Sequence, residues 1–304
     1  MARRKKGDPV NGWLILDKPV SMTSTQAVGY VRRVFNAQKA GHAGTLDPLA
    51  TGILPIALGE ATKTVPFAVD GAKAYRFAVR WGAETETDDS EGRVARTSER
   101  RPRLDEIEAE LPKFIGEIMQ QPPAYSAIKV AGERAYDLAR GGEIVDLAPR
   151  PVVIDALRVA DMPDDATTIF EAECGRGTYV RAIARDLGRL LGCYGHVVAL
   201  RRTRVGGFDE AIAVTREAIE ATIAAGGDLM ALLAPVEAAL DDITALPVSS
   251  DDATRLRNGG SVLIRGRDAP VLSGPAFAIC KGQLVALGEL DKGEFHPTRV
   301  FMLG

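Results

Sequence analysis

The alternation of hydrophobic and polar positions along this chain of 304 residues predicts several β-strands. Residues 75–81 alternate strictly, so a strand there would place four large side chains on one face: Tyr75, Phe77, Val79 and Trp81. An apolar run at residues 13–16 stops at a loop and predicts a buried strand, and residues 167–174 predict another.

Helical periodicity is clearest over residues 180–191, where an amphipathic helix would turn five side chains inward: Val180, Ile183, Ala184, Leu187 and Leu191. A shorter helix is expected after Ser24. Residues 104–118 predict a helix interrupted at Pro112, and the Ala-rich residues 210–240 also favour helix.

Composition along the chain suggests three regions and one long excursion. Residues 1–8 are expected to form a flexible basic tail, residues 9–245 a first domain, and residues 246–304 a small β domain with short strands and frequent Gly and Pro. Residues 120–151 are dense in Pro and Gly, and loops of this length are usually functional or disordered.

Overall composition is that of a folded protein, because 46% of the residues are hydrophobic and 26% are charged. A net charge of −3 argues against a protein that coats nucleic acid indiscriminately. Charge is unevenly placed, however. Residues 84–91 are acidic and are expected to form a solvated loop, whereas residues 173–204 hold seven arginines against two acids. The basic stretch favours a focused site for an anion.

Cellular location is predicted from the apolar segments and the cysteines. The basic N-terminus is not followed by the longer apolar h-region of a signal peptide, and no run of about 18 apolar residues occurs, so neither a signal peptide nor a membrane span is expected. Three cysteines at distant spacings are typical of reduced thiols. These features predict a cytoplasmic protein.

Several common sites lack their sequence signals. The three histidines lie far apart and no Cys/His cluster occurs, so a metal site is not expected. Residues 175–180 (GRGTYV) lack the third glycine and the later acid of a dinucleotide loop. They are better interpreted as a turn with Thr178 as the N-cap of the following helix, which would put Tyr179 and Arg181 at its mouth.

The stretch AGHAGTLDPLATG, residues 40–52, has neither helical nor strand periodicity. Pro48 disfavours the α conformation at Asp47, and Gly41, Gly44 and Gly52 permit tight turns and the close approach of a ligand. From the residues alone, a plain surface turn and a functional loop both remain open. Likewise Arg181, Arg185 and Arg189 fall on one helix face, which could simply be solvated.

A family resemblance decides between these interpretations. GHAGTLDPLATG closely resembles the catalytic motif of the tRNA pseudouridine-55 synthases, the TruB family. Further matching segments occur in the family's order: NGWLILDKPVSMTS (11–24), PIALGEATK (55–63), AYRF (74–77), PPAYSAIKV (122–130), GRGTYVRAIARDLG (175–188) and ALRRTRVGGF (199–208). Ser21 stands where the family usually has Gly. The C-terminal part resembles a PUA domain more weakly, mainly through ATRLRNG (253–259).

The resemblance implies an α+β protein. Its first domain would have the pseudouridine synthase fold, built on a mixed, largely antiparallel central sheet, and a small PUA-like β domain that binds RNA would come after it. The implied enzyme isomerises uridine 55 in the T-loop of tRNA to pseudouridine, without cofactor or metal. It would be a monomer with tRNA as partner, no obligate protein partner and no membrane.

The resemblance also implies roles for individual residues. Asp47 would be the catalytic aspartate, gripped two-pronged by Arg181, with Tyr75 stacked on the flipped uracil and Tyr179 beside the reacting nucleoside. Other positions would contact the RNA or position the loops: His42 in the space left by flipped bases, Leu200 at the uracil pocket beside Arg201 and Arg202, and Lys18 and Lys63. Residues 120–151 would clamp RNA, and the arginine-rich segment would meet phosphates.

Two rival functions stay open on the sequence. An RNA-binding or RNA-folding protein could use the same surface without turnover, although intact Asp47, Tyr75, Tyr179 and Arg181 argue against lost catalysis. A nucleoside hydrolase could use Asp47 and water, although the basic surface and extra β domain suit a macromolecular substrate. Isomerisation leaves the mass of the RNA unchanged, whereas hydrolysis releases uracil.

Overall fold

A mixed sheet of ten strands runs through the centre of the computed structural model, which describes residues 7–126, 128–130, 133–135, 141, 147–264 and 273–303. Its main path is β14 (Val214–Thr215), β1 (Gly12–Lys18), β3 (Thr51–Leu58), β12 (Gly195–Val205), β4 (Lys73–Trp81), β11 (Thr167–Cys174), β10 (Arg150–Asp164) and β7 (Gly116–Gln120). Off this path, β2 (Ala40–His42) pairs with β3 and β13 (Phe208–Asp209) with β12. Among the described strands of this sheet, only β1–β14 and β3–β12 pair in parallel, so the predicted mixed, largely antiparallel sheet is confirmed.

The middle of this sheet is built on the alternation in β4. Phe77, Val79 and Trp81 are buried on one face, as predicted, and Tyr75 lies half-buried on the same face. Antiparallel β11 places Phe170 opposite Phe77, with their rings stacked at 5.4 Å between centroids. The strand is therefore anchored by packed aromatic rings, which fixes where its first residues emerge.

Helices cover the sheet at several points: α1 (Ser24–Val34), α2 (Val65–Asp70), α3 (Leu104–Glu110), α5 (Val180–Leu190) and α6 (Arg216–Ala224). Short 3₁₀ turns are η1 (Gly59–Lys63), η2 (Leu111–Phe114), η3 (Glu210–Ile212), η4 (Leu229–Leu232) and η5 (Val236–Ala239). The inward face predicted for α5 is confirmed, since all five of its apolar side chains are buried. A capping box between Thr23 and Gln26 starts α1.

Two helix predictions were wrong in extent. Over residues 104–118, α3 ends before Pro112 and the chain continues through η2 into strand β7, because a proline cannot extend a helix. Over residues 210–240, only α6 is an α-helix. Val214 pairs with Leu16 of β1, and Gly226 in a left-handed conformation ends the helix, so pairing and chain breaks override alanine content.

The acidic segment 84–91 was also predicted wrongly, as a solvated loop. It begins in β5 (Ala83–Thr85), which pairs with β6 (Val94–Thr97), and Glu84, Asp88 and Asp89 are buried, with at most 6% of each exposed. The segment meets two arginines of α5, because Asp88 pairs with Arg185 and Glu84 with Arg189.

A second sheet has the order β15 (Thr244–Pro247), β17 (Gly274–Cys280), β18 (Gln283–Asp291), β19 (Glu294–Val300) and β16 (Val262–Leu263), with α7 (Ser250–Arg257) against it. It has its own apolar core, but Phe277, Leu287 and Phe301 belong to a cluster that also includes Trp13 of the large sheet. The boundary at residue 246, the PUA-like character and an RNA-binding role of this sheet stay predictions.

Two predicted segments fall largely outside the described residues. Of the tail at residues 1–8, only residues 7 and 8 are described, and Asp8 pairs with Ala37. Of the excursion at residues 120–151, the described part includes residues 120–126, the short pair β8 (Lys129–Val130) and β9 (Glu133–Arg134), and residues 147–151.

Candidate active site

The loop that carries Asp47 lies between β2 and β3 and is held by hydrogen bonds on both sides of the aspartate. The buried Ser24 Oγ accepts from the Leu46 N–H at 2.8 Å and donates to the Leu46 carbonyl at 3.0 Å. The Pro48 carbonyl accepts from the Ser21 N–H at 2.8 Å and from Lys18 Nζ at 3.4 Å. Both neighbours of Asp47 are therefore fixed by the segment at residues 18–24.

Ser21 itself adopts a left-handed conformation, with φ of 67°. This conformation favours glycine, the residue usual in the family, and is uncommon for serine. The strain is carried at the residue whose N–H holds Pro48, which links the departure from the family pattern to the Asp47 loop.

Arg202 supports the same loop through hydrogen bonds from the protein interior. Its guanidinium is buried and donates to the carbonyls of Gly44, Thr45 and Ile53 at 3.1, 3.4 and 2.8 Å. Gly52 has a φ of +96°, and a Cβ there would lie 2.2 Å from the Arg202 carbonyl oxygen, so only glycine allows β3 and β12 to meet here. Burial lowers the pKa of Arg202. The side chain thus supports the loop from within the protein.

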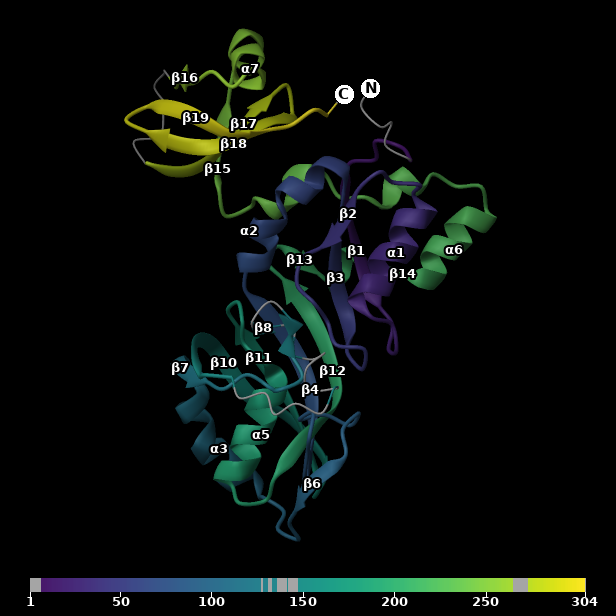
Figure 1. Cartoon of the computed structure of the whole chain (residues 1–304), viewed down its shortest axis with the longest axis vertical. Helices are drawn as coiled ribbons and strands as arrows, with labels where there is room; N and C mark the ends of the chain where they lie inside the picture. Colours follow the sequence, from purple (N-terminus) through teal and green to yellow (C-terminus); the bar gives the residue numbers. More distant parts are fainter. Residues whose placement is uncertain are drawn as a thin grey trace.

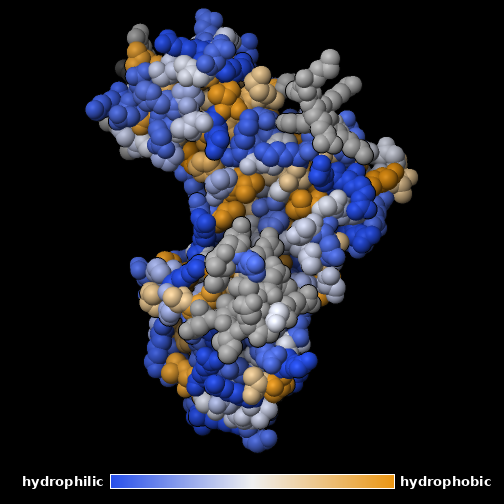
Figure 2. All heavy atoms as spheres, viewed as in Figure 1, coloured by the Kyte–Doolittle hydropathy of each residue, from blue (hydrophilic) through white to orange (hydrophobic). Residues whose placement is uncertain are grey.

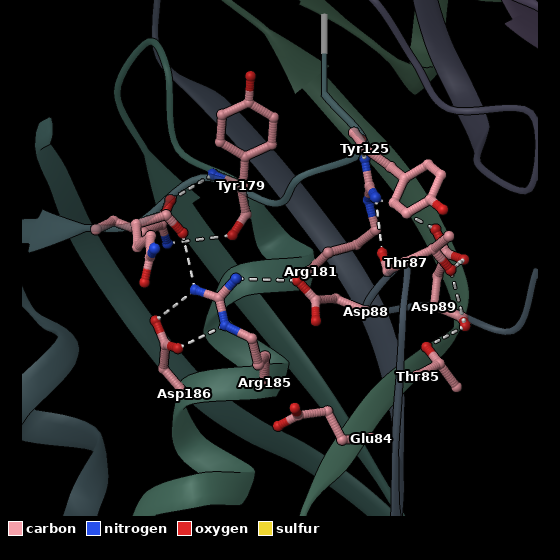
Figure 3. Close-up of polar contacts among 12 residues, drawn as sticks. Glu84, Thr85, Thr87, Asp88, Asp89, Tyr125, Tyr179, Arg181, Arg185 and Asp186 are labelled. Atoms are coloured by element: carbon pink, nitrogen blue, oxygen red, sulfur yellow. Dashed lines mark hydrogen bonds and ion pairs between the residues drawn. The ribbon is translucent and has the colours of Figure 1, made fainter. Parts of the chain in front are cut away.

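Asp47 meets Arg181 at this loop, with 2.9 Å between Oδ2 and the guanidinium Nε. Arg181 is 5% exposed and Asp47 34%, so one carboxylate remains accessible above a buried cation. The other two guanidinium nitrogens donate to the carbonyls of Thr87 and Tyr125 at 2.8 and 2.9 Å, and Asp89 lies 3.5 Å from Nη1. Every nitrogen of Arg181 is therefore engaged by a different protein group, which fixes its orientation, and Asp47 is held through one nitrogen instead of the two-pronged grip expected. Figure 3 shows Arg181 with Thr87 and Tyr125.

The next arginine along α5 repeats this pattern one turn later. Arg185 lies 3.0 Å from Asp88 and 2.8 Å from Asp186, and donates to the Gln121 carbonyl at 2.8 Å (Figure 3). Burial raises the pKa of Asp88 to about 6, against the opposing charge of Arg185. The arginine face of α5 is thus an ion-paired contact with the segment at 84–91, and the alternative of a solvated face was wrong for Arg181 and Arg185.

Tyr179 immediately precedes α5 and acts as its N-cap residue, so the expectation that Thr178 caps the helix was wrong. The buried side-chain amide of Gln120 accepts from the Tyr179 N–H at 2.8 Å and donates to its carbonyl at 3.2 Å. Burial raises the pKa of the Tyr179 hydroxyl, so the phenol stays protonated at neutral pH. Figure 3 shows its ring projecting away from the ion pairs of α5.

Tyr75 and Lys18 both lie close enough to Asp47 for its charge to act on them. In the sheet register Tyr75 is opposite Arg202, and burial raises its pKa while the Arg202 guanidinium opposes that shift. Burial lowers the pKa of Lys18 to about 8, opposed by the charge of Asp47, and Lys18 Nζ also donates to the Pro19 and Met22 carbonyls at 2.9 and 2.8 Å. Lys18 therefore acts as a loop-positioning group here.

The remaining predicted residues divide between the site and elsewhere. Leu200 and Arg201 line a cavity of about 360 Å³ with Leu49 and Thr51, which come shortly after Asp47. Arg201 is paired with Asp17 at 2.9 Å and Glu210 at 2.6 Å. His42 is half-buried at the end of β2, just before the loop. Lys63 lies instead where the two sheets meet, with Nζ 2.6 Å from the Val300 carbonyl.

Sequence reasoning missed the groups that support these residues. Ser24 and Gln120 each hold both backbone polar groups of one residue, Leu46 and Tyr179 respectively. Ser24 falls in the motif at residues 11–24, and Gln120 lies just before PPAYSAIKV, so motif proximity was the available signal. The sequence signal at Asp88 and Asp89 was misleading, because an acidic run usually indicates a solvated surface.

Comparison with known proteins agrees with this geometry. Residues 32–180 match the TruB family pseudouridylate synthase N-terminal domain, and residues 181–241 match the tRNA pseudouridylate synthase B C-terminal domain. A protein of Nitrobacter winogradskyi named tRNA pseudouridine synthase B is 61% identical over 99% of this chain and 85% of its own length. The chain belongs to the TruB family.

Other relatives extend this match. The Caulobacter vibrioides protein named tRNA pseudouridine synthase B is 55% identical and aligns over the full length of both chains. The predicted enzyme class, a pseudouridine synthase, is thereby confirmed. Membership of the TruB family also explains why the motifs cluster around Asp47 and α5.

Solved structures support the fold. A chain from a Cbf5–Nop10–Gar1 complex superposes with a TM-score of 0.75 at 24% identity, covering 99% of this chain and 91% of the other. A chain from an H/ACA RNP bound to a substrate RNA containing 2'-deoxyuridine gives a TM-score of 0.74 at 22% identity, covering 99% and 92%. At these identities the likeness concerns the fold alone.

Metal-binding clusters and membrane-spanning helices are both missing from the described residues. No group of three or more His, Cys, Asp or Glu side chains there is arranged to hold a metal ion. None of the helices in that part of the chain is both long and apolar enough to span a membrane.

Proposed function

We propose that this TruB-family enzyme isomerises uridine 55 in the T-loop of tRNA to pseudouridine in the cytoplasm. The observation that carries the proposal is the Asp47–Arg181 pair, in which a partly exposed carboxylate rests on a buried, fully engaged guanidinium. The relatives named tRNA pseudouridine synthase B support tRNA as the substrate.

The reaction requires the N-glycosidic bond to break, the uracil to rotate and C5 to join the sugar. The uridine must first leave the stacked loop, and an aromatic side chain such as Tyr75 offsets part of the lost stacking. Asp47 then acts on the nucleoside, and Arg181 keeps the carboxylate oriented. Tyr179, held by Gln120, packs beside the reacting nucleoside.

Incubation with an unmodified T stem-loop tests the proposal. The RNA should acquire pseudouridine without a change of mass, and its affinity should fall steeply with added salt because phosphates contribute to binding. Release of uracil would instead identify a hydrolase. Tight binding without any product would identify an RNA-binding protein that has lost turnover.

Residues 246–304 and the excursion at 120–151 are proposed to assist RNA binding, the second as a clamp. The catalytic roles assigned above leave the second sheet free for this purpose, since Asp47, Tyr75, Tyr179 and Arg181 all lie in the first domain. A monomeric enzyme that needs no protein partner stays a prediction.

A further inference from the structure

The arginine-rich stretch at residues 173–204 was expected to meet RNA phosphates, yet each of its arginines has a protein partner. Six of them form ion pairs: Arg176 with Asp70, Arg181 with Asp47, Arg185 with Asp88, Arg189 with Glu84, Arg201 with Asp17 and Arg204 with Glu173. Arg202 is buried against carbonyls. The cations best placed for a phosphate must therefore be sought among basic side chains without carboxylate partners.

Such side chains line a cavity of about 390 Å³ where the two sheets meet. Lys39, Lys63 and Phe67 border it from the first sheet and its helices, and Leu287, Thr298 and Arg299 from the second. Lys39 and Arg299 make no ion pair or side-chain hydrogen bond within the described part of the chain. We call this cavity, with Lys39, Lys63 and Arg299, the seam pocket.

Within the seam pocket, the ammonium group of Lys63 is held in place by protein groups. Its Nζ donates to Glu60 Oε2 and to the Val300 carbonyl, both at 2.6 Å, and lies 5.4 Å from the centre of the Phe301 ring. An ammonium group has three N–H donors, so one remains for a ligand. Because Glu60 also accepts from the Met302 N–H at 3.0 Å, the two sheets are joined directly beneath the pocket.

The charges of the lining favour an anion in the seam pocket. Among the described residues, three cations line it and no carboxylate does, and Lys63 alone among the three has a carboxylate partner, Glu60, which also accepts from the Met302 N–H. The Thr298 hydroxyl at the rim is neutral and donates to the Leu287 carbonyl at 3.3 Å, so it adds no opposing charge. Lysine and arginine converging on a polar cavity are the usual recognition groups for phosphate.

The position of the pocket fits an RNA already bound at Asp47. Strand β3 begins four residues after Asp47 and ends where η1, which carries Lys63, begins. Its eight residues span roughly 26 Å at about 3.3 Å each. Figure 1 shows α2 and the second sheet at this end of β3, and in Figure 2 the surface is indented between the second sheet and the half of the molecule that carries α5.

We propose that the seam pocket binds a backbone phosphate of the RNA whose uridine occupies the active site. The inference rests on the proposed function for the identity of the RNA. It adds that the second sheet contributes to binding through Arg299, in a pocket that neither sheet forms alone.

The test uses the full chain, because truncation at residue 246 would uncover Trp13 and the apolar cluster it shares with Phe301. Lys39→Gln, Arg299→Gln and the double variant remove the two cations without protein partners. Lys281→Gln/Lys292→Gln, at exposed turns of the second sheet, is the matched control for lost charge. Lys63 is left intact because it joins the sheets.

The readouts are the affinity for unmodified tRNA as a function of salt and the single-turnover rate at saturating RNA. The double variant should lower the slope of log K against log salt by roughly one, as expected for one lost phosphate contact, and weaken binding about tenfold near physiological salt, with the rate within about twofold of wild type.

Two results would overturn the inference. These are an unchanged slope in the double variant and an equal decrease in the lysine control. If wild-type protein forms no pseudouridine, the proposed function fails instead, and the two failures are thereby distinguished.

Discussion

The arginines of α5 and the cations of the seam pocket have similar charge but opposite surroundings. Arg181 and Arg185 are buried, and protein carboxylates and carbonyls occupy their donors. Lys39 and Arg299 are exposed and face a cavity. Burial of a guanidinium costs desolvation free energy, so its donors must be paired with protein groups. An exposed cation stays hydrated and can exchange water for a ligand. A high density of basic residues in the sequence therefore does not show which cations are free to bind a ligand.

The arginines of α5 have a structural role, because they join this helix to two other segments of the chain. Arg181 and Arg185 reach the acidic segment at 84–91 on one side and the carbonyls of Tyr125 and Gln121 on the other. Arg189 reaches only Glu84 among its described partners, and its side chain is 42% exposed. The same helix thus offers two levels of burial for the same kind of ion pair.

The largest expected effect comes from Arg185→Met compared with Arg189→Met. Arg185→Met leaves Asp88 buried and unpaired, which should lower the free energy of unfolding by about 3–5 kcal/mol. Arg189→Met should cost only about 1 kcal/mol, because that pair is partly exposed and Arg96 remains 3.9 Å from Glu84. Urea unfolding of both variants measures the difference.

Equal losses in the two variants would show that burial does not separate these pairs. As a control on the comparison with the seam pocket, neither variant should change the salt dependence of tRNA binding, because both arginines are already paired with carboxylates.

A smaller effect is expected from pH. The pKa of Asp88 is raised from 3.8 to about 6, so the folded protein holds a proton there that the unfolded chain releases. The stability from protonated Asp88 is complete below about pH 4 and is lost as the pH rises through about 6. Relative to Asp88→Asn, wild type should lose about 1–3 kcal/mol between about pH 4 and pH 7, measured by urea unfolding. A constant difference across this range would contradict the raised pKa.

The smallest change in free energy is expected from Arg181→Lys. Lysine keeps the charge but cannot engage Asp47, Thr87 and Tyr125 at once. Single-turnover isomerisation should slow by at least about tenfold, while tRNA affinity stays close to wild type. Near-normal chemistry at saturating RNA would reduce Arg181 to a point charge and remove its role in orienting Asp47.

Sequence reasoning succeeded where a local pattern carries the structure. Strict alternation located β4, apolar periodicity located α5, and a specific motif brought Asp47 and Arg181 together. It failed at Asp88 and Asp89, because whether an acidic run is solvated depends on arginines that lie about a hundred residues later in the chain. It failed over residues 210–240 because strand pairing with β1 overrides helix propensity.

The role of Arg202 could not be predicted either. Its place in the motif suggested contact with substrate, but its burial is a property of the sheet: Gly52 lets β3 approach β12 so closely that the guanidinium is enclosed beneath the Asp47 loop. The location of Lys63 could not be predicted either. Lys63 belongs to a family motif, but the eight residues of β3 separate it from the Asp47 loop and bring it to the place where the two sheets meet.

The central claim is that Asp47 performs the isomerisation of uridine 55. It is tested most directly by treating unmodified tRNA with wild type and Asp47→Asn, followed by carbodiimide mapping of pseudouridine. Wild type should give one signal at position 55, and the variant none, with tRNA affinity within about tenfold because the amide keeps the shape of the side chain. Turnover by Asp47→Asn near the wild-type rate, or a wild-type signal at another position only, would contradict it.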